Sequence, residues 1–460
     1  MNLSIDALIE VTGAGVRHRD KFPERVSIAT DTRTLTRGEL FVALRGENFD
    51  GHAFVAEALA RGASGLVVSD LLSLPEDAPA LIVGDPLVAY QAFAAVARGA
   101  IEANVVAVTG STGKTTTKDL IAQLLESAGC GPIAATPANE NNEIGVAKLF
   151  LSLQPNVRSV VAELGARRPG EILPLAQLAR PDVAVVTNVG DAHLELMGTR
   201  ERLAATKFEI FATGAQPIVN ADDPTSRERG RDLPGDPIWF AARDAASNNL
   251  PKGRVVALLG RTTLVVREPG ETRHHAIECT LPGDHNLSNV AAAIAAALAA
   301  GAPLQRVIDA LPSLALPSGR YERVRVGVFD LIYDAYNASL SGSLATLRSF
   351  ERERAARKVA VLGSMAELGA DAPAMHERVG AAAASSGIAA LLVGGEFAAD
   401  LARGARKAGY PAQSIIPFAD SVAAVAWLRA NASSGDLVLL KASRRYHLEQ
   451  VLEGLRAAHA

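Results

Sequence analysis

The sequence predicts an α/β protein of three domains. Apolar runs of strand length alternate with segments of helical spacing, and this alternation restarts after a glycine-rich turn near residue 110 and again near residue 318. The 460 residues are enough for about three domains with ample core. We therefore expect a small α/β domain over residues 1–100, a central domain over 101–314 and a C-terminal domain over 315–460.

The first 100 residues hold three strand candidates and two helical stretches. The strand candidates are the apolar runs at 40–44, 65–68 and 80–83, and apolar residues at helical spacing cover 54–61 and 88–98. Short strands interleaved with helices predict a small α/β unit.

The central domain opens on a glycine-rich turn between an apolar strand, 105–108, and an amphipathic helix, 118–125. In that context, backbone N–H groups and a helix N-terminus cradle phosphates, a lysine reaches the outer phosphates and a threonine hydroxyl binds magnesium. An ordinary glycine turn is the alternative, because the early glycine of the usual pattern is replaced by Val108. The turn predicts a nucleoside triphosphate site made of Gly110, Ser111, Thr112, Gly113, Lys114, Thr115 and Thr116.

Three more strands of the central domain, 160–163, 183–187 and 217–220, are nearly all apolar, as expected when both sheet faces are covered. Short alternating runs between Ile238 and Leu281 predict an antiparallel patch. The alanine-rich segment 286–300 predicts a buried helix.

The C-terminal domain resumes the parallel pattern. Its repeated strand–helix units predict a second doubly wound, Rossmann-like sheet, with an active site beyond the carboxyl ends of the strands. The strand candidates are 330–333, 358–362, 390–393 and 436–440.

Polar residues follow the strand ends of the central domain. Glu163 ends one strand, and Asn188, Asp191 and His193 follow the next. With the Thr115 hydroxyl, these groups could converge on magnesium beside the phosphates. Magnesium prefers oxygen ligands, which favours Glu163, whereas a lone histidine such as His193 can equally be structural.

Five further residues are candidate site residues, and several of them also have an ordinary structural explanation. Asn286 and Asn289 share one face of a helix start, where they could cap the helix or bind an adenine edge. Arg320 and Asp334 would suit a γ-phosphate and a ribose across an interdomain cleft, although surface arginines are common. Lys207 would by default be a surface lysine.

The composition excludes several classes of protein. A formal charge of −4 gives no electrostatic footprint for nucleic acid or an anionic membrane. Two cysteines, Cys130 and Cys279, are too few for a disulfide framework. The N-terminus has no signal-peptide pattern, and the longest apolar run, 290–300, is too short to span a bilayer. We expect a cytoplasmic protein without nucleic-acid or membrane partners.

These motifs resemble the Mur ligases, a family of ATP-dependent amide-forming enzymes of peptidoglycan synthesis. The matches follow in order through nearly the whole chain, which is far more specific than any single motif. They are Asp31-Thr32-Arg33, 38–46, the turn at 109–117, Asn141–Gly145, Glu163-Leu164-Gly165, 187–194, Lys207–Ile210, Asn220–Asp223, His285-Asn286 with Asn289, Gly319-Arg320, Asp334, Tyr336–Ala338, 362–369 and Lys441 with Ser443-Arg444.

The resemblance implies roles for these residues. Lys114, Glu163, His193 and Lys207 would be catalytic. Two magnesium ions would be held by Thr115, Glu163, His193 and Lys207, with Lys207 carbamylated by carbon dioxide into a carboxylate-like ligand. Asn286 and Asn289 would lie near the adenine of ATP, and Arg320 and Asp334 would contact phosphate and ribose. The substrate-binding residues would be Asp31, Thr32, Arg33, Asn142 and Glu143.

The resemblance also implies the reaction, which within the family is most similar to dipeptide addition. ATP would phosphorylate the terminal carboxylate of a UDP-muramoyl tripeptide, and the amine of D-alanyl-D-alanine would attack the acyl phosphate. The products would be an amide, ADP and phosphate. The third domain would close over the site, and the protein would act as a monomer.

The sequence departs from the family pattern in three places: Ser339-Leu340 in place of Asn-Pro, Arg167-Arg168 in place of Asn-His, and Ala442 in place of glycine. Leucine for proline removes a rigid turn. A ligase that uses the same chemistry on a different amine is therefore one alternative. The other is a nucleotide switch without ligase activity, against which the combination of Glu163, His193 and Lys207 argues.

Overall fold

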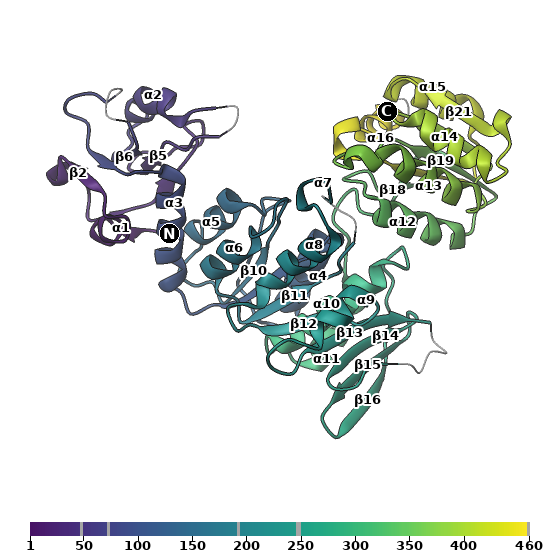
Figure 1. Cartoon of the computed structure of the whole chain (residues 1–460), viewed down its shortest axis with the longest axis horizontal. Coiled ribbons are helices and arrows are strands. Elements are labelled where there is room, and N and C mark those ends of the chain that lie inside the picture. The colour runs from purple at the N-terminus through teal and green to yellow at the C-terminus, as the bar shows by residue number, and fades with distance from the viewer. Residues whose placement is uncertain (47–48, 71–73, 191–193, 245–249, 458–460) are drawn as a thin grey trace.

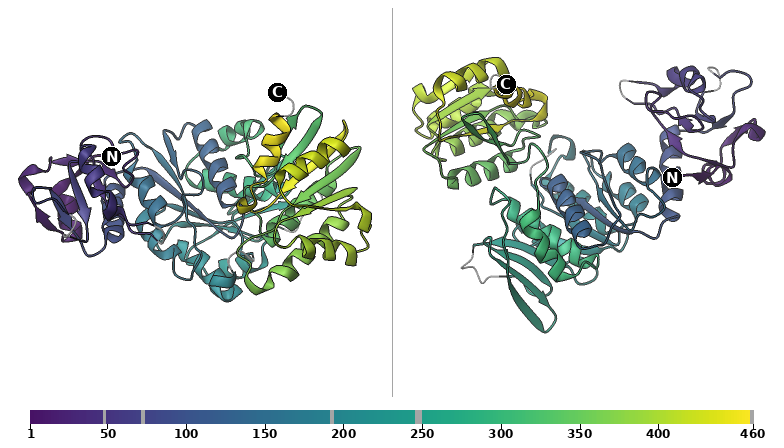
Figure 2. Two further views of the ribbon diagram at one scale, coloured as in Figure 1. Left: turned by 90° about the horizontal axis from the view of Figure 1, so that it is seen from above. Right: turned by 180° about the vertical axis from the view of Figure 1, so that it is seen from behind.

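The computed structural model describes residues 1–46, 49–70, 74–190, 194–244 and 250–457. Figure 1 shows three α/β lobes in chain order, and the two outer lobes lie at opposite ends of the central one in every view of Figures 1 and 2. Their main sheets have five, nine and six strands, and each lies within one of the three predicted segments. The predicted α/β fold class is confirmed.

The N-terminal lobe is a five-stranded sheet in the order β2-β7-β6-β5-β4, beside a β1–β3 ribbon. Only β2 runs antiparallel to its neighbour in this sheet. Helix α3 begins at Pro86. Asp85 caps it by accepting a hydrogen bond from the Leu87 N–H group (2.8 Å). The elements are β1 (Leu3–Ser4), α1 (Ile5–Thr12), β2 (Gly15–Arg17), β3 (Arg25–Val26), β4 (Ile28–Ala29), β5 (Leu40–Val42), α2 (Val55–Ala60), β6 (Gly65–Val68), β7 (Ala80–Ile82) and α3 (Pro86–Gly99).

The central sheet has the order β16-β15-β14-β13-β12-β11-β8-β10-β9. Its strands are β8 (Asn104–Thr109), β9 (Ile133–Ala135), β10 (Ser159–Glu163), β11 (Val183–Val186), β12 (Gln216–Asn220), β13 (Ile238–Arg243), β14 (Val255–Leu259), β15 (Thr263–Glu268) and β16 (Glu271–Ala276). The predicted antiparallel patch is confirmed, because β15 pairs antiparallel with both β14 and β16, whereas β13, at the start of the predicted segment, pairs in parallel with β12 and β14. The first four residues of β13 are buried, as in a strand covered on both faces.

Alternate side chains of β8 enter two different cores, as the pleat requires. Val106 and Val108 join the cluster built with α4, α10 and α11, whereas Val105 and Ala107 join a cluster with α5 and α6. The predicted buried helix is confirmed as α10, whose residues 290–297 are fully buried. The helices are α4 (Lys114–Ser127), α5 (Glu143–Leu151), α6 (Ile172–Ala179), α7 (Leu194–Met197), α8 (Arg200–Phe208), α9 (Pro224–Gly230), α10 (Asn286–Ala299) and α11 (Leu304–Ala310).

The C-terminal sheet has the order β17-β18-β22-β19-β20-β21 and is parallel except for β17. One face packs against α12, α13 and α14, and the other against α15 and α16. This is the predicted doubly wound arrangement. The elements are β17 (Glu322–Val326), β18 (Phe329–Tyr333), α12 (Leu340–Arg352), β19 (Arg357–Leu362), α13 (Ala372–Ala384), β20 (Ala390–Gly394), α14 (Ala398–Lys407), β21 (Ile415–Phe418), α15 (Ser421–Asn431), β22 (Asp436–Lys441) and α16 (Glu449–Ala457).

The first two lobes share one hydrophobic core. Helix α3 packs against α1 on one side and against α5 and α6 on the other, so a single cluster joins residues of both lobes. The C-terminal lobe has separate clusters on the two faces of its sheet. Among the described residues, no helix is long and apolar enough to cross a membrane.

Substitution of Phe93 tests this shared core. Phe93 is fully buried in the cluster that joins the first two lobes, so Phe93→Ala should lower the free energy of unfolding by about 3–5 kcal/mol. Hydrogen exchange should accelerate in both lobes and stay unchanged in the C-terminal lobe. Val88→Ala on the same helix is the control, because Val88 is 60% exposed. Faster exchange in only one lobe would contradict the shared core.

Candidate active site

The phosphate loop connects β8 to α4, next to the point where β8 is flanked by β10 and β11. Two glycines allow its path. Gly110 has φ +144° and Gly113 has φ +79°. A Cβ on Gly110 would lie 1.9 Å from the Thr187 hydroxyl, and one on Gly113 would lie 2.3 Å from the Asn289 side-chain oxygen. Both positions therefore require glycine.

Asn188, two residues after the end of β11, holds the loop in place. Its main-chain oxygen accepts the Ser111 N–H (2.9 Å), and its side-chain oxygen accepts the Thr112 N–H (3.1 Å). Its amide nitrogen and the Thr187 hydroxyl both donate to the Thr112 carbonyl, at 3.1 and 2.6 Å. The sequence marked Asn188 only as a polar residue at a strand end, and the structure gives it a loop-positioning role.

Lys114 begins α4 and lies within the loop. Its Nζ donates to the carbonyl of Gly110 at 3.0 Å. Desolvation lowers the pKa of Lys114, and this effect is opposed by Glu163 and reinforced by Arg320. Arg320 belongs to the C-terminal lobe, so that lobe places a positive charge near the phosphate loop.

Glu163 ends β10 and is 1% exposed. One carboxylate oxygen accepts a hydrogen bond from the Asn141 amide at 2.6 Å, whereas the other is buried and has no hydrogen-bond partner among the described residues. A buried carboxylate oxygen without a partner is costly, and a cation would satisfy it. Thr115, also buried, lies in the first turn of α4. These two residues fit a magnesium site of oxygen ligands.

Lys207, on α8, is 1% exposed, so the default interpretation as a surface lysine is wrong. Its Nζ lies 3.4 Å from the Ala166 carbonyl. Burial lowers the pKa of Lys207 to about 7, helped by repulsion from Lys114 and opposed by Glu171, Glu163 and Glu209. Near neutral pH, much of this amine is uncharged.

Within the described ranges, no three His, Cys, Asp or Glu side chains gather as a metal cluster. Asp191 and His193 lie outside the described residues. The described part of the predicted metal site therefore consists of Glu163, Thr115 and Lys207.

The two asparagines of α10 do not cap the helix, because His285 occupies the N-cap position. The Asn289 amide donates to Asn286 (3.0 Å) and its oxygen accepts from the Thr117 hydroxyl (3.3 Å), beside Gly113. Asn286 is 3% exposed and donates to the Pro282 carbonyl. The structure brings Asn289 to the phosphate loop, with Asn286 behind it.

The C-terminal lobe contacts the loop through the first turn of α12. Gly342 faces the Thr112 methyl group, and Ser341 faces Gly190. Arg320 stacks on the Tyr336 ring, 4.3 Å from its centroid.

Asp334 is turned into the C-terminal lobe. Its carboxylate accepts from the Tyr321 N–H (3.2 Å) and the Thr346 hydroxyl, and it pairs with Lys441 (3.0 Å). With these three partners, the contact of Asp334 with ribose stays a prediction.

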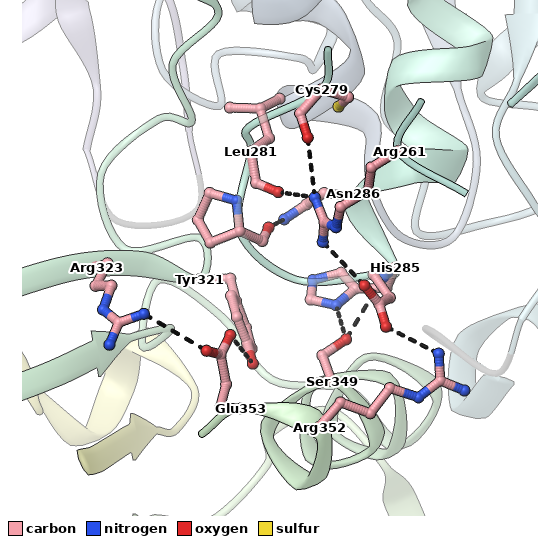
Figure 3. Close-up of polar contacts among 12 residues, drawn as sticks. Arg261, Cys279, Leu281, His285, Asn286, Tyr321, Arg323, Ser349, Arg352 and Glu353 are labelled. Carbon is pink, nitrogen blue, oxygen red and sulfur yellow. Dashed lines mark hydrogen bonds and ion pairs between the residues drawn. The ribbon is translucent and has the colours of Figure 1, made fainter. Parts of the chain in front are cut away.

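Charged and polar pairs join the central and C-terminal lobes (Figure 3). Asp284 pairs with Arg261 of its own lobe at 2.9 Å and with Arg352 of α12 at 2.8 Å. The His285 ring lies 2.9 Å from the Ser349 hydroxyl. Burial lowers the pKa of His285 to about 4, so the ring is neutral. A polar cavity of about 200 Å³ lies beside these residues.

The predicted substrate residues lie in two places, one in the N-terminal lobe and one at the start of α5. Asp31 pairs with the exposed Arg33 at 2.6 Å, which holds the pKa of Asp31 at about 2, and Thr32 between them is buried. Asn142 caps α5 by accepting the Gly145 N–H (2.9 Å), and the exposed Glu143 begins that helix. Their contact with substrate stays a prediction.

Comparison with known proteins decides the family. Residues 26–95 match the Mur ligase catalytic domain, 108–297 the Mur ligase middle domain and 319–444 the Mur ligase glutamate ligase domain. A UDP-N-acetylmuramoyl-tripeptide–D-alanyl-D-alanine ligase of Synechocystis sp. is 36% identical over 437 residues, which is 94% of this chain and 92% of that one. The chain belongs to the Mur ligase family.

Solved structures agree with this assignment. A crystal structure of MurF from Acinetobacter baumannii has a TM-score of 0.85 and 26% identity, and covers 99% of both chains. The MurF ligase of Thermotoga maritima, solved in complex with ADP, has a TM-score of 0.80 and 28% identity, and covers 94% of this chain and 97% of that one.

Local packing absorbs two of the three departures from the Mur ligase pattern. Ser339 caps α12 by accepting the Gly342 N–H (3.3 Å), and Leu340 takes the first helical position with its side chain buried in the core. That position tolerates proline as well, so the exchange preserves the helix start. Ala442 faces Gly363. A Cβ atom added to Gly363 would lie only 2.6 Å from the Ala442 Cβ, so the glycine leaves room for the alanine.

The remaining departure, Arg167-Arg168, forms a contact between lobes of this Mur ligase. Arg167, in the central lobe, lies 3.9 Å from Glu367 of the C-terminal lobe. The N–H groups of Arg167 and Arg168 both donate to Glu171, at 2.8 and 3.0 Å.

Removal of the Asn188 side chain tests the loop. Asn188→Ala deletes the hydrogen bonds that fix Thr112, so ATP binding should weaken about tenfold to a hundredfold without unfolding. Titration of a nonhydrolysable ATP analogue by calorimetry measures this. Asn431→Ala, at an exposed helix end, is the matched control. Equal affinities of the two variants would remove Asn188 from the loop's support.

Proposed function

We propose that this chain is an ATP-dependent ligase that joins D-alanyl-D-alanine to a UDP-N-acetylmuramoyl tripeptide in peptidoglycan precursor synthesis. The proposal rests chiefly on likeness over 94% of the chain to a ligase of that name. Lys114 in the phosphate loop and the buried Glu163 and Lys207 support the chemistry.

The first half of the reaction activates a carboxylate. A carboxylate is a poor acyl donor, so its oxygen attacks the γ-phosphorus of ATP, the bond to the β-phosphate oxygen breaks, and ADP leaves. Lys114 and the N–H groups at the start of α4 stabilise the charge on the transferred group. When bound by Thr115 and Glu163, magnesium supplies positive charge that offsets the phosphate oxygens.

The second half forms the amide. The neutral amine of the dipeptide attacks the acyl carbon, a tetrahedral intermediate forms, and phosphate leaves as the amine loses a proton. Arg320 and the first turn of α12 come from the C-terminal lobe, so closure of this lobe would complete the site and exclude water.

We also propose that Lys207 is carbamylated. Its uncharged amine would attack carbon dioxide, forming a new N–C bond and releasing a proton to solvent. The product carries a negative charge, so the Lys114 ammonium that disfavours a charged Lys207 amine would then attract the carbamate. Its two oxygens would give a second magnesium ion the oxygen ligands that the amine lacks.

Neither alternative function gains support from the described residues. Ser339, Leu340 and Ala442 are accommodated by local packing, so they give no reason to expect a different amine. A simple nucleotide switch has no need of a buried lysine at Lys207. A monomeric, cytoplasmic enzyme remains the prediction from the sequence.

Phosphate release tests the proposed substrates. With ATP, magnesium and UDP-muramoyl tripeptide, D-alanyl-D-alanine should stimulate release strongly, and a panel of single amino acids and other dipeptides should not. Lys114→Ala should abolish turnover, because the γ-phosphate loses the cation that the loop provides. Slow release that ignores both donor and amine would indicate a switch, and stimulation by another amine would indicate a different pathway.

Labelled bicarbonate tests the carbamate. Only the neutral amine reacts with carbon dioxide, so a ¹³C carbamate signal should strengthen as pH rises through about 7 and weaken below it. Lys207→Ala should lack the signal and lose activity, and short-chain carboxylates should restore part of that activity. Full activity of Lys207→Ala without added carboxylate would remove Lys207 from the site.

A further inference from the structure

The guanidinium groups of two arginines lie over the ring of Tyr336. Arg320 lies 4.3 Å and Arg444 5.4 Å from the ring centroid. Arg320 precedes β17, Tyr336 follows β18 and Arg444 follows β22, so segments far apart in sequence meet at one edge of the C-terminal sheet. The Tyr336 hydroxyl is buried and has no hydrogen-bond partner in the described part of the chain.

Neighbouring cations are paired, whereas Arg320 and Arg444 have no ion pair within the described part of the chain. Lys441 pairs with Asp334 at 3.0 Å, and Arg445 lies 4.0 Å from Glu396. Two positive charges on one ring repel each other, and stacking on an aromatic face offsets this only in part. The pair is therefore suited to anionic ligands.

Hydrogen bonds fix the backbone beside Arg444. The Ser443 hydroxyl accepts the Ala366 N–H (3.0 Å) and donates to the Ala338 carbonyl (3.2 Å). The Ser443 N–H donates to the Ser364 carbonyl (3.2 Å). These hydrogen bonds join the segments after β18, β19 and β22, so the backbone next to Arg444 is held in place.

The two arginines occupy different positions relative to the phosphate loop. Arg320 is close enough to Lys114 to affect it electrostatically, which fits a contact with the transferred phosphate. Arg444 is exposed and directly follows Ser443, which hydrogen-bonds to Ala366. The residue after Ala366, Glu367, lies 3.9 Å from Arg167 of the central lobe. Arg444 is therefore free to bind a second anion at the lobe interface.

We propose that Arg444, held against Tyr336, binds the free C-terminal carboxylate of the incoming dipeptide. This inference rests on the proposed function. The reaction consumes the dipeptide's amine and leaves its carboxylate ionised, so a cation at that end would distinguish a free dipeptide from a blocked one. A fully extended dipeptide spans about 7 Å, so its carboxylate can lie well away from the amine that attacks beside the transferred phosphate. Guanidinium binds carboxylate in a bidentate geometry.

Dipeptide amide tests the assignment directly. The wild-type ligase should use D-alanyl-D-alanine about 10- to 100-fold better, in kcat/KM, than D-alanyl-D-alanine amide, because the amide lacks the charge that Arg444 binds. In Arg444→Ala, the KM for the acid should rise by a similar factor, the KM for ATP should stay constant, and the preference for acid over amide should fall to about one.

Matched variants separate binding from structural damage. Arg445→Ala, at the next position and 71% exposed, should keep the wild-type preference. Tyr336→Phe should also keep it, because the ring remains, whereas Tyr336→Leu should lose much of it. An equal loss of acid and amide turnover in Arg444→Ala would overturn the inference and leave the proposed function intact. No stimulation of the wild-type enzyme by D-alanyl-D-alanine would overturn both.

Discussion

The site depends on charged side chains beside the phosphate loop that lack a full set of partners. Lys114 donates to the carbonyl of its own loop, Glu163 keeps one buried oxygen unpaired, and Lys207 is buried with a pKa of about 7. In a low dielectric each of these is unfavourable unless a ligand completes it. A phosphate would neutralise Lys114, a divalent cation would satisfy Glu163, and carbon dioxide would change the charge of Lys207. The unfavourable free energy of these groups in the empty site is relieved when the reactants bind, which strengthens their binding.

The rest of the fold serves to hold this arrangement. Strand β8 delivers the loop, β10 delivers Glu163, and β11 delivers Asn188, which clamps the loop from the side. The C-terminal lobe meets the loop through α12 and is joined to the central lobe through Asp284, which pairs with arginines of both lobes. Because exposed ion pairs are weak individually, such a junction can open and close while the cores on either side stay intact.

Much of this could be predicted from the sequence, because the features concerned are local. The apolar strands, the glycine-rich loop and the polar residues at strand ends follow from chain periodicity and backbone geometry. The strand β17 was missed because charged residues alternate along Glu322–Val326 and leave no apolar run. Burial of Lys207 could not be read from the polar helix α8, since it arises where α8 packs against α6. Likewise, the role of Asn188 depends on its contacts with Thr112 in a loop 76 residues earlier.

The most direct test of the account is the fate of oxygen in the acyl donor. The UDP-muramoyl tripeptide would be labelled with ¹⁸O in its terminal carboxylate and turned over with ATP and D-alanyl-D-alanine. If the carboxylate attacks ATP and the amine then displaces phosphate, each phosphate released must carry one ¹⁸O atom from the donor. Unlabelled phosphate would mean that water attacks ATP, and the acyl-phosphate ligase described here would be wrong.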